Sequence, residues 1–216
     1  MNRKTLLVGV VKPLLFAAGL APLATLFWRG LNNTLGANPV ETLSHETGLW
    51  ALRLLLLTLA MTPLRRITGW PEWMRMRRMM GLYSFLYATL HVLVYLWLDQ
   101  EFRFTAILED VTERPYITAG ALTFLMLLPL AATSFNQAIR WLGGKRWIRL
   151  HRLVYPCGLG AVIHYLWLVK ADLTPPLTYL VILLTLLAFR IPPSFLQKLR
   201  GYFAGKVETK YERYQT

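Results

Sequence analysis

The stretch MMGLYSFLYATLHVLVYLWL, residues 79–98, decides the fold class. It contains no Asp, Glu, Lys or Arg, and it has the length of about 20 residues that an α-helix needs to cross a bilayer. The whole chain is 55% hydrophobic with a mean hydropathy of +0.40, above the apolar content of roughly 45–50% in soluble domains. Similar apolar runs recur at 5–28, 47–64, 116–135, 153–169 and 173–189.

These runs predict an all-α membrane protein, a bundle of six transmembrane helices. The connections between them are short and leave no room for a soluble domain. We therefore expect one membrane domain over residues 1–196. A basic cytoplasmic tail is expected over 197–216, too short for a nucleotide-binding domain.

The charge of the chain predicts its orientation. The net charge is +13, and six spans place 19 of the 24 Lys and Arg residues on one side of the membrane. Cytoplasmic loops carry such an excess, so both termini are expected inside a bacterial inner membrane and the acidic 99–114 loop outside. Topology and lipid head groups account for the basic residues, and no nucleic-acid partner is predicted.

Two histidines within the spans are the main functional candidates. His91 lies about 10 Å from the outer end of the third span and His164 about 8 Å from the outer end of the fifth, at 1.5 Å per residue. Two imidazoles at one depth on different helices can supply the axial ligands of a haem. The alternative is a structural histidine that is satisfied by a backbone carbonyl.

Arg53 in the second span lies at nearly the same depth, roughly 9 Å from the outer end. A buried guanidinium binds an anion, and a haem propionate is one candidate. Snorkelling to the outer interface or binding a lipid is the other. His45 is expected in the first outer connection as a surface residue, with a ligand role left open.

His151 is expected at the inner end of the fifth span, about 20 Å from His164. The same 13-residue interval on the third span leads from His91 to Arg78, with Arg77 one residue further back, and arginine does not ligate iron. A second haem would therefore be held from one side. Thirteen residues make about 3.6 turns, so His151 and His164 are not expected to share a helix face.

A basic inner rim surrounds His151. It suits a flavin phosphate or a quinone carbonyl, although the positive-inside topology explains most of it without a ligand. The rim consists of Arg75, Arg77, Arg78, Lys145, Arg146, Arg149 and Arg152.

The segments RRMMGLYSFLYATLH (77–91) and LHRLVY (150–155), followed by His164 and Tyr165, resemble the ferric reductase-like transmembrane family. The resemblance covers nearly the whole chain. It implies a six-helix cytochrome with one or two haems b, and FMN is implied as well. By position it makes His91 and His164 the expected haem ligands and His151 a further candidate.

The resemblance also implies a role. Electrons would pass from membrane quinol or a cytoplasmic flavin reductase to a periplasmic molybdopterin-containing methionine sulfoxide reductase, the expected heterodimer partner. The chain departs from the NADPH oxidase branch in lacking an appended flavin and nicotinamide domain. It also has Arg78 where that branch tends to have another haem histidine, which argues against a stacked pair of bis-histidine haems.

No catalytic residue is expected in the chain itself, because a haem with two histidine ligands has no open coordination site and relays single electrons. Quinol oxidation would also need a proton acceptor, for which His151 is the best-placed titratable group. One alternative is a direct reductase of external iron chelates. Another is a transporter that uses His91, His164 and Arg53 as its polar site, but the sequence has no inverted repeat and no intramembrane carboxylate.

Overall fold

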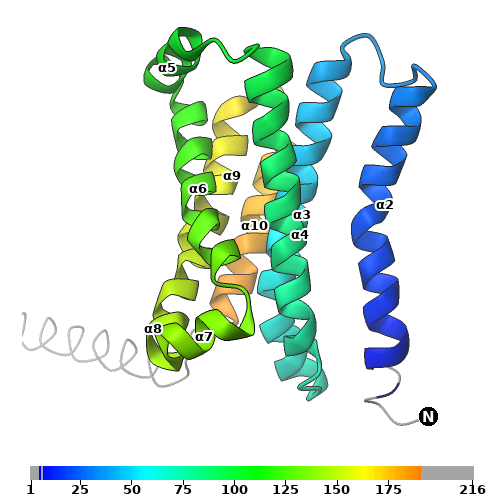
Figure 1. The fold of residues 1–216 in the computed structure, drawn as a ribbon, viewed down its shortest axis with the longest axis vertical. Helices are drawn as coiled ribbons and strands as arrows, with labels where there is room; N and C mark the ends of the chain where they lie inside the picture. Colours follow the sequence, from blue (N-terminus) through cyan, green and yellow to red (C-terminus); the bar gives the residue numbers. More distant parts are fainter. Residues whose placement is uncertain (1–4, 6, 191–216) are drawn as a thin grey trace, which may run out of the picture.

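The computed structural model describes residues 5 and 7–190, and every regular element within them is a helix (Figure 1). The expected tail at 197–216 and the last residues of the expected membrane domain lie outside the described residues. In chain order the elements are η1 (Leu7–Val11), α2 (Lys12–Leu31), α3 (Pro39–Thr68), α4 (Trp73–Leu93), η2 (Val94–Asp99), α5 (Phe104–Glu113), α6 (Pro115–Ala132), α7 (Asn136–Leu142), α8 (Gly144–Leu150), η3 (His151–Leu153), α9 (Val154–Leu168) and α10 (Thr174–Ala188).

Four helical segments are long and apolar enough to cross a membrane, and they match the first four predicted spans. The predicted fifth and sixth spans coincide with α9 and α10, which have 15 residues each, fewer than the about 20 of a typical crossing. The all-helical prediction is thus confirmed for the described residues, while six spans and cytoplasmic termini stay predictions. The four segments are Gly9–Leu31, Pro39–Thr68, Trp73–Asp99 and Pro115–Ala132.

Helix α3 is longer than predicted because its start is well capped. The side chain of Asn38 accepts a hydrogen bond from the backbone N–H of Glu41 at 3.2 Å, and Pro39 occupies the first turn, where its missing N–H costs nothing. The helix ends at Gly69, whose φ of 70° favours glycine. His45, predicted in a connection, therefore lies in the second turn of α3, although its side chain is exposed as expected.

The core is a closed ring of four helices. Helix α3 packs on α4, α4 on α6, α6 on α9 and α9 on α3, while α10 covers the seam between α3 and α9. Leu59, Cys157 and Leu183 meet in this core with no exposed surface. The outward faces carry exposed apolar side chains such as Leu122 and Val181, as expected of helices that contact lipid.

Helix α2 lies at the edge of the bundle (Figure 1) and is attached by tyrosine hydroxyls. Pro22 lies inside α2 and has no N–H to donate. One residue on, the Tyr87 hydroxyl accepts from the N–H of Leu23 at 3.1 Å and donates to the carbonyl of Gly19 at 2.8 Å. A side chain of α4 is thereby inserted into the backbone hydrogen-bond ladder of α2.

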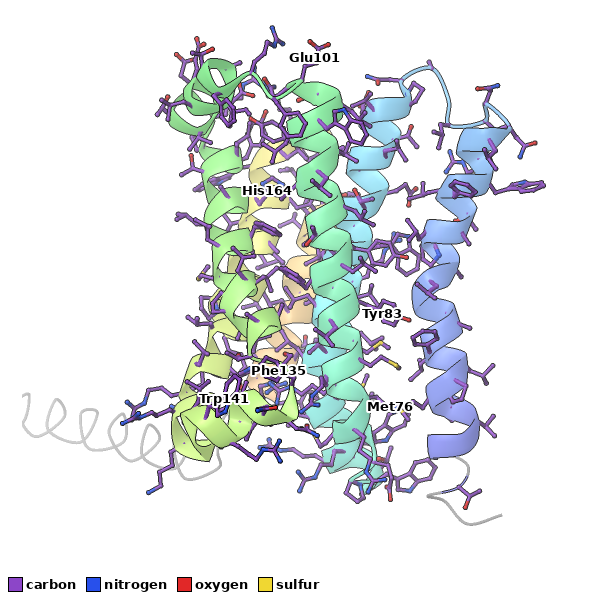
Figure 2. All side chains as sticks on the ribbon, viewed as in Figure 1. Met76, Tyr83, Glu101, Phe135, Trp141 and His164 are labelled. Atoms are coloured by element: carbon purple, nitrogen blue, oxygen red, sulfur yellow. The ribbon has the colours of Figure 1, made fainter. Side chains whose placement is uncertain are left out.

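The acidic 99–114 connection, expected as a loop, contains the ten-residue helix α5 across one end of the bundle (Figure 1). Asp110 holds it in place: its carboxylate accepts from Tyr95 and Gln100 and forms an ion pair with Arg114 at 3.1 Å. We call this end of the bundle the outer end, and the end with α7 and α8 the inner end. Figure 2 shows His164 nearer to Glu101 at the outer end than to Met76 or Phe135.

Candidate haem site

The side chains of His91 and His164 meet inside the four-helix ring. They come from α4 and α9, and their ring centroids lie 6.0 Å apart with an angle of 77° between the ring planes. The two helices run in the same direction, so equal depth in the sequence gives equal height in the bundle. The structure therefore brings together the two histidines that the depth argument paired.

Each ring is oriented by a backbone carbonyl of a neighbouring helix. Nδ1 of His91 lies 2.8 Å from the carbonyl oxygen of Ser44 in α3, and Nδ1 of His164 lies 2.6 Å from that of Tyr116 in α6. A carbonyl only accepts, so each Nδ1 carries the proton and donates it. Nε2 of each neutral ring then has a free lone pair, the arrangement usual in histidines that ligate metals.

A glycine one turn further along the same helix makes room for each ring. A Cβ on Gly120 would lie 2.8 Å from Nδ1 of His164, and a Cβ on Gly48 would lie 3.1 Å from Nδ1 of His91. The glycine follows the carbonyl residue by four positions in both cases, so α3 and α6 present the same seat to the two rings. Side-chain size at these two positions therefore controls where the imidazoles lie.

The donor set fits a haem better than a bare metal ion. Among the described residues no three His, Cys, Asp or Glu side chains come together, so the protein offers two ligands and the metal would have to bring the rest, as iron in a porphyrin does. An imidazole nitrogen lies about 2 Å from a metal that it ligates. Two rings on opposite sides of one ion therefore have centroids about 6 Å apart, which is the separation of this pair.

Arg53 lies at the outer level but faces α10. Its Nε donates to the hydroxyl of Tyr179 at 2.9 Å, and its guanidinium carbon lies 4.9 Å from the ring centre of Trp50. The half-buried side chain is thus held between α3 and α10. The ring of His45 meets the ring of Tyr165 edge to face, with 6.4 Å between the ring centroids.

His151 lies at the inner end and uses its other nitrogen. The Thr133 hydroxyl donates to the carbonyl of Pro129 at 2.6 Å, so at 3.0 Å it accepts from Nε2–H of His151. The ring also stacks on Trp147 at 3.9 Å. Burial, followed by the positive charges of Arg77 and Arg78, lowers the pKa of His151 below its usual value.

His151 and His164 were not expected to share a face, yet both contact α6 or the residue that caps it. The residues His151–Leu153 form a 3₁₀ turn, which rotates the chain by about 120° per residue instead of 100°. Over three residues the extra rotation is about 60°, which reduces the angle between His151 and His164 around the helix but does not place them on one face. The partner of His151 at this level is a threonine, because the other three histidines lie toward the outer end.

The basic rim divides into one half-buried arginine and several exposed ones. Arg77 precedes His91 by 14 residues, about 3.9 turns, so both lie on nearly the same side of α4. It is half-buried, whereas Arg78 and Arg149 are exposed. Arg77 therefore, not Arg78, stands in the interior where a second histidine would be needed.

Sequence reasoning missed several residues that build these two levels. Ser44 and Tyr116 act through backbone carbonyls, which no residue pattern marks. Gly48 and Gly120 carry a weak signal, since an isolated glycine in an apolar helix often permits a close approach. Arg190 was not singled out among the basic residues of the inner side, and its contacts with Tyr155 were not foreseen.

Comparison with known proteins identifies relatives over most of the chain. Residues 47–162 match the family described as ferric reductase like transmembrane component. A protein from Bordetella pertussis named protein-methionine-sulfoxide reductase heme-binding subunit MsrQ is 50% identical over 85% of this chain and 90% of its own length. Proteins with the same name from Xanthomonas campestris pv. campestris and Xanthomonas axonopodis pv. citri are 48% identical over 88% of this chain and 90% of theirs.

Proposed function

The chain belongs to the ferric reductase-like transmembrane family, and from this premise we propose that it is the haem b-binding membrane subunit of a methionine sulfoxide reductase system. In this role it relays electrons across the bacterial inner membrane. The acceptor is a periplasmic molybdopterin reductase of the MsrP type that repairs oxidised proteins and forms a heterodimer with this subunit. The names of relatives at about half identity over most of their length support this assignment.

The observation that carries the proposal is the histidine pair at the outer level. His91 and His164 face each other with both Nδ1 atoms bonded to carbonyls, which leaves two Nε2 atoms for one iron. The haem, when bound, supplies the one-electron chemistry. Ser44 and Tyr116 fix the orientation of the two rings, and a fixed ligand orientation lowers the reorganisation that accompanies each electron transfer.

Arg53 is the proposed partner of a haem propionate. It lies at the level of the histidine pair, and its contacts with Tyr179 and Trp50 hold it there without a carboxylate. A guanidinium with unfilled donor positions binds a carboxylate through short charge-assisted hydrogen bonds. Lipid binding is the alternative for this residue.

Electrons enter at the inner end in this proposal. Arg77, Arg78 and Arg149 form a basic surface beside His151, suited to a flavin phosphate or a quinone carbonyl, so FMN, the quinol pool and a cytoplasmic flavin reductase are the candidate donors. His151 serves as proton acceptor for a quinol or as the single ligand of a second haem. The proposal includes six spans with both termini in the cytoplasm, a topology in which this end is the donor side.

The test is the absorption spectrum of the oxidised and dithionite-reduced protein, purified in detergent with His91→Ala, His164→Ala and His151→Ala beside it. We expect a b-type haem spectrum that is lost in the first two variants and survives in the third. A colourless wild-type protein, expressed with ample haem, would exclude the cytochrome function. Loss of haem in His151→Ala would move a ligand to the inner level.

Direct reduction of external iron chelates is the second candidate, favoured by the family description. It needs haem but no protein partner. Turnover with ferric citrate and no periplasmic reductase separates the two functions. A rate equal to that with the methionine sulfoxide reductase present would favour the iron reductase.

A further inference from the structure

The end of α10 carries a guanidinium that is fixed inside the bundle. Nη1 of Arg190 donates to the hydroxyl of Tyr155 at 2.9 Å, and Nη2 donates to the carbonyl of Leu59 at 2.6 Å. Its central carbon also lies 5.2 Å from the ring centre of Tyr155. These contacts join α10 to α9 and α3 and hold the charge at the inner end.

One donor of this group is left over. Nε of Arg190 is buried and has no hydrogen-bond partner among the described residues. Buried donors are nearly always paired, and a buried charged donor is the most costly to leave unpaired. An acceptor that carries negative charge would satisfy both requirements.

A second arginine lies near the first. Arg77 of α4 is half-buried and within electrostatic reach of Arg190 and Tyr155. In the part of the chain that the structure describes, the ion pair found joins Arg114 to Asp110 at the outer end, and neither inner arginine pairs with a carboxylate. Two partly buried like charges repel each other, so an anion bound beside both would stabilise the inner end.

We propose that Arg77 and Arg190 form a seat for a phosphate group, with Tyr155 as the residue that positions Arg190. Guanidinium groups match phosphate oxygens with parallel hydrogen bonds, and phosphate is abundant at a membrane face. Two sources share this chemistry: the head group of an anionic phospholipid and the phosphate ester of a flavin nucleotide. The second source deepens the donor side of the proposed function and rests on it.

The test compares two pairs of ligands. FMN and riboflavin differ in the phosphate ester, and phosphatidylglycerol and phosphatidylcholine differ in whether the phosphate charge is balanced by a choline cation. Full-length protein in phosphatidylcholine nanodiscs is dialysed to equilibrium against FMN or riboflavin. In a second arm the detergent-solubilised protein is mixed with equal amounts of phosphatidylglycerol and phosphatidylcholine and purified again. Mass spectrometry then quantifies each lipid that stays bound. Arg77→Gln, Arg190→Gln and Tyr155→Phe are compared with Arg65→Gln, which removes an exposed arginine at the inner end of α3.

We expect the wild type to prefer the ligand with a net anionic phosphate, FMN or phosphatidylglycerol, by about tenfold in at least one arm, the size of one charge-assisted hydrogen bond. Arg77→Gln and Arg190→Gln should each abolish most of this preference, Tyr155→Phe should weaken it, and Arg65→Gln should keep it. Preference for FMN alone assigns a soluble ester, and preference for phosphatidylglycerol alone assigns a lipid.

No preference for FMN over riboflavin and none for phosphatidylglycerol over phosphatidylcholine, or a preference that survives the arginine substitutions, would overturn the site. Should Arg190→Gln fail to fold, Arg77→Gln and Tyr155→Phe carry the same comparison. The haem spectrum is read in the same samples. A missing spectrum with an intact phosphate preference speaks against the relay alone, and the reverse result speaks against the phosphate seat alone.

Discussion

The same two helices build opposite chemistry at their two ends. At the outer end, α4 and α9 present His91 and His164. Each neutral ring donates its Nδ1–H to a backbone carbonyl, so its lone pair is on Nε2. At the inner end the same helices and their extension present Arg77 and His151, and the Nε2 of that histidine is engaged by Thr133. A metal needs lone pairs and an anion needs N–H groups, so the outer level suits iron and the inner level suits negative charge.

The largest expected effect comes from filling the space that Gly120 leaves for the ring of His164. Gly120→Ala places a methyl group 2.8 Å from Nδ1 of His164, which displaces the ring and its carbonyl bond. We expect haem content to fall at least about tenfold, in line with the roughly 1–3 kcal/mol cost of overpacking, measured by the reduced spectrum per mole of protein.

The matched control is Gly81→Ala in α4, whose new methyl group would make ordinary contact at 3.7 Å with Thr58. It should bind haem like the wild type. Gly48→Ala, with its 3.1 Å approach to His91, should fall between the two. Equal haem content in all three variants would show that the glycine seats do not position the ligands.

Removing the outer arginine should change the redox potential without removing the haem. At an effective dielectric constant of about 20, a positive charge within about 10 Å of a redox centre changes its energy by roughly 1–2 kcal/mol. We therefore expect Arg53→Gln to lower the midpoint potential by about 50 mV. Potentiometric titration measures this shift. Arg140→Gln removes an exposed charge at the inner end and should leave the midpoint potential unchanged. Equal shifts in the two variants would contradict a location of Arg53 beside the haem.

At the inner level, Thr133→Val should cost stability and leave the outer haem intact. The substitution keeps the shape of the side chain and removes the hydroxyl that links His151 to Pro129. We expect the free energy of unfolding to fall by about 1 kcal/mol. Denaturant titration measures this loss. A change in the haem spectrum would contradict the separation of the two levels.

The smallest effect concerns pH. Because the folded-state pKa of His151 is lowered, the unfolded chain takes up this proton more readily than the folded one. At a pH above the ordinary histidine pKa of about 6.5, His151 therefore costs no stability. Stability is lost as the pH falls from 6.5 toward the folded-state pKa. Melting temperatures between pH 7.5 and 5 should fall less steeply in His151→Asn, and parallel curves would contradict the shift.

The sequence predicted the outer pair because helix rise alone sets the depth of His91 and His164, and α4 and α9 run in the same direction. It could not predict the carbonyls of Ser44 and Tyr116, since every residue carries the same backbone groups. Ser44 was also placed outside the span, because an apolar window cannot detect a helix start fixed by the Asn38 cap.

The inner level was predicted less well. The 13-residue match selected Arg78, whereas the half-buried arginine of α4 is Arg77, 14 residues or about 3.9 turns before His91. The 3₁₀ turn at His151–Leu153 was not predicted either. Arg190 did not stand out from the other basic residues of the inner side, and its contacts depend on the packing of α10 against α3 and α9. Contacts between distant segments of this kind leave no local signal in the sequence.

The tyrosine that joins α4 to α2 has a consequence for how the protein is made. Before α4 is synthesised, the Leu23 N–H and the Gly19 carbonyl beside Pro22 have no Tyr87 hydroxyl to bind. These two groups are four residues apart, so without the hydroxyl they can pair with each other as in a regular helix, and the tyrosine enters this turn only when α4 packs against α2.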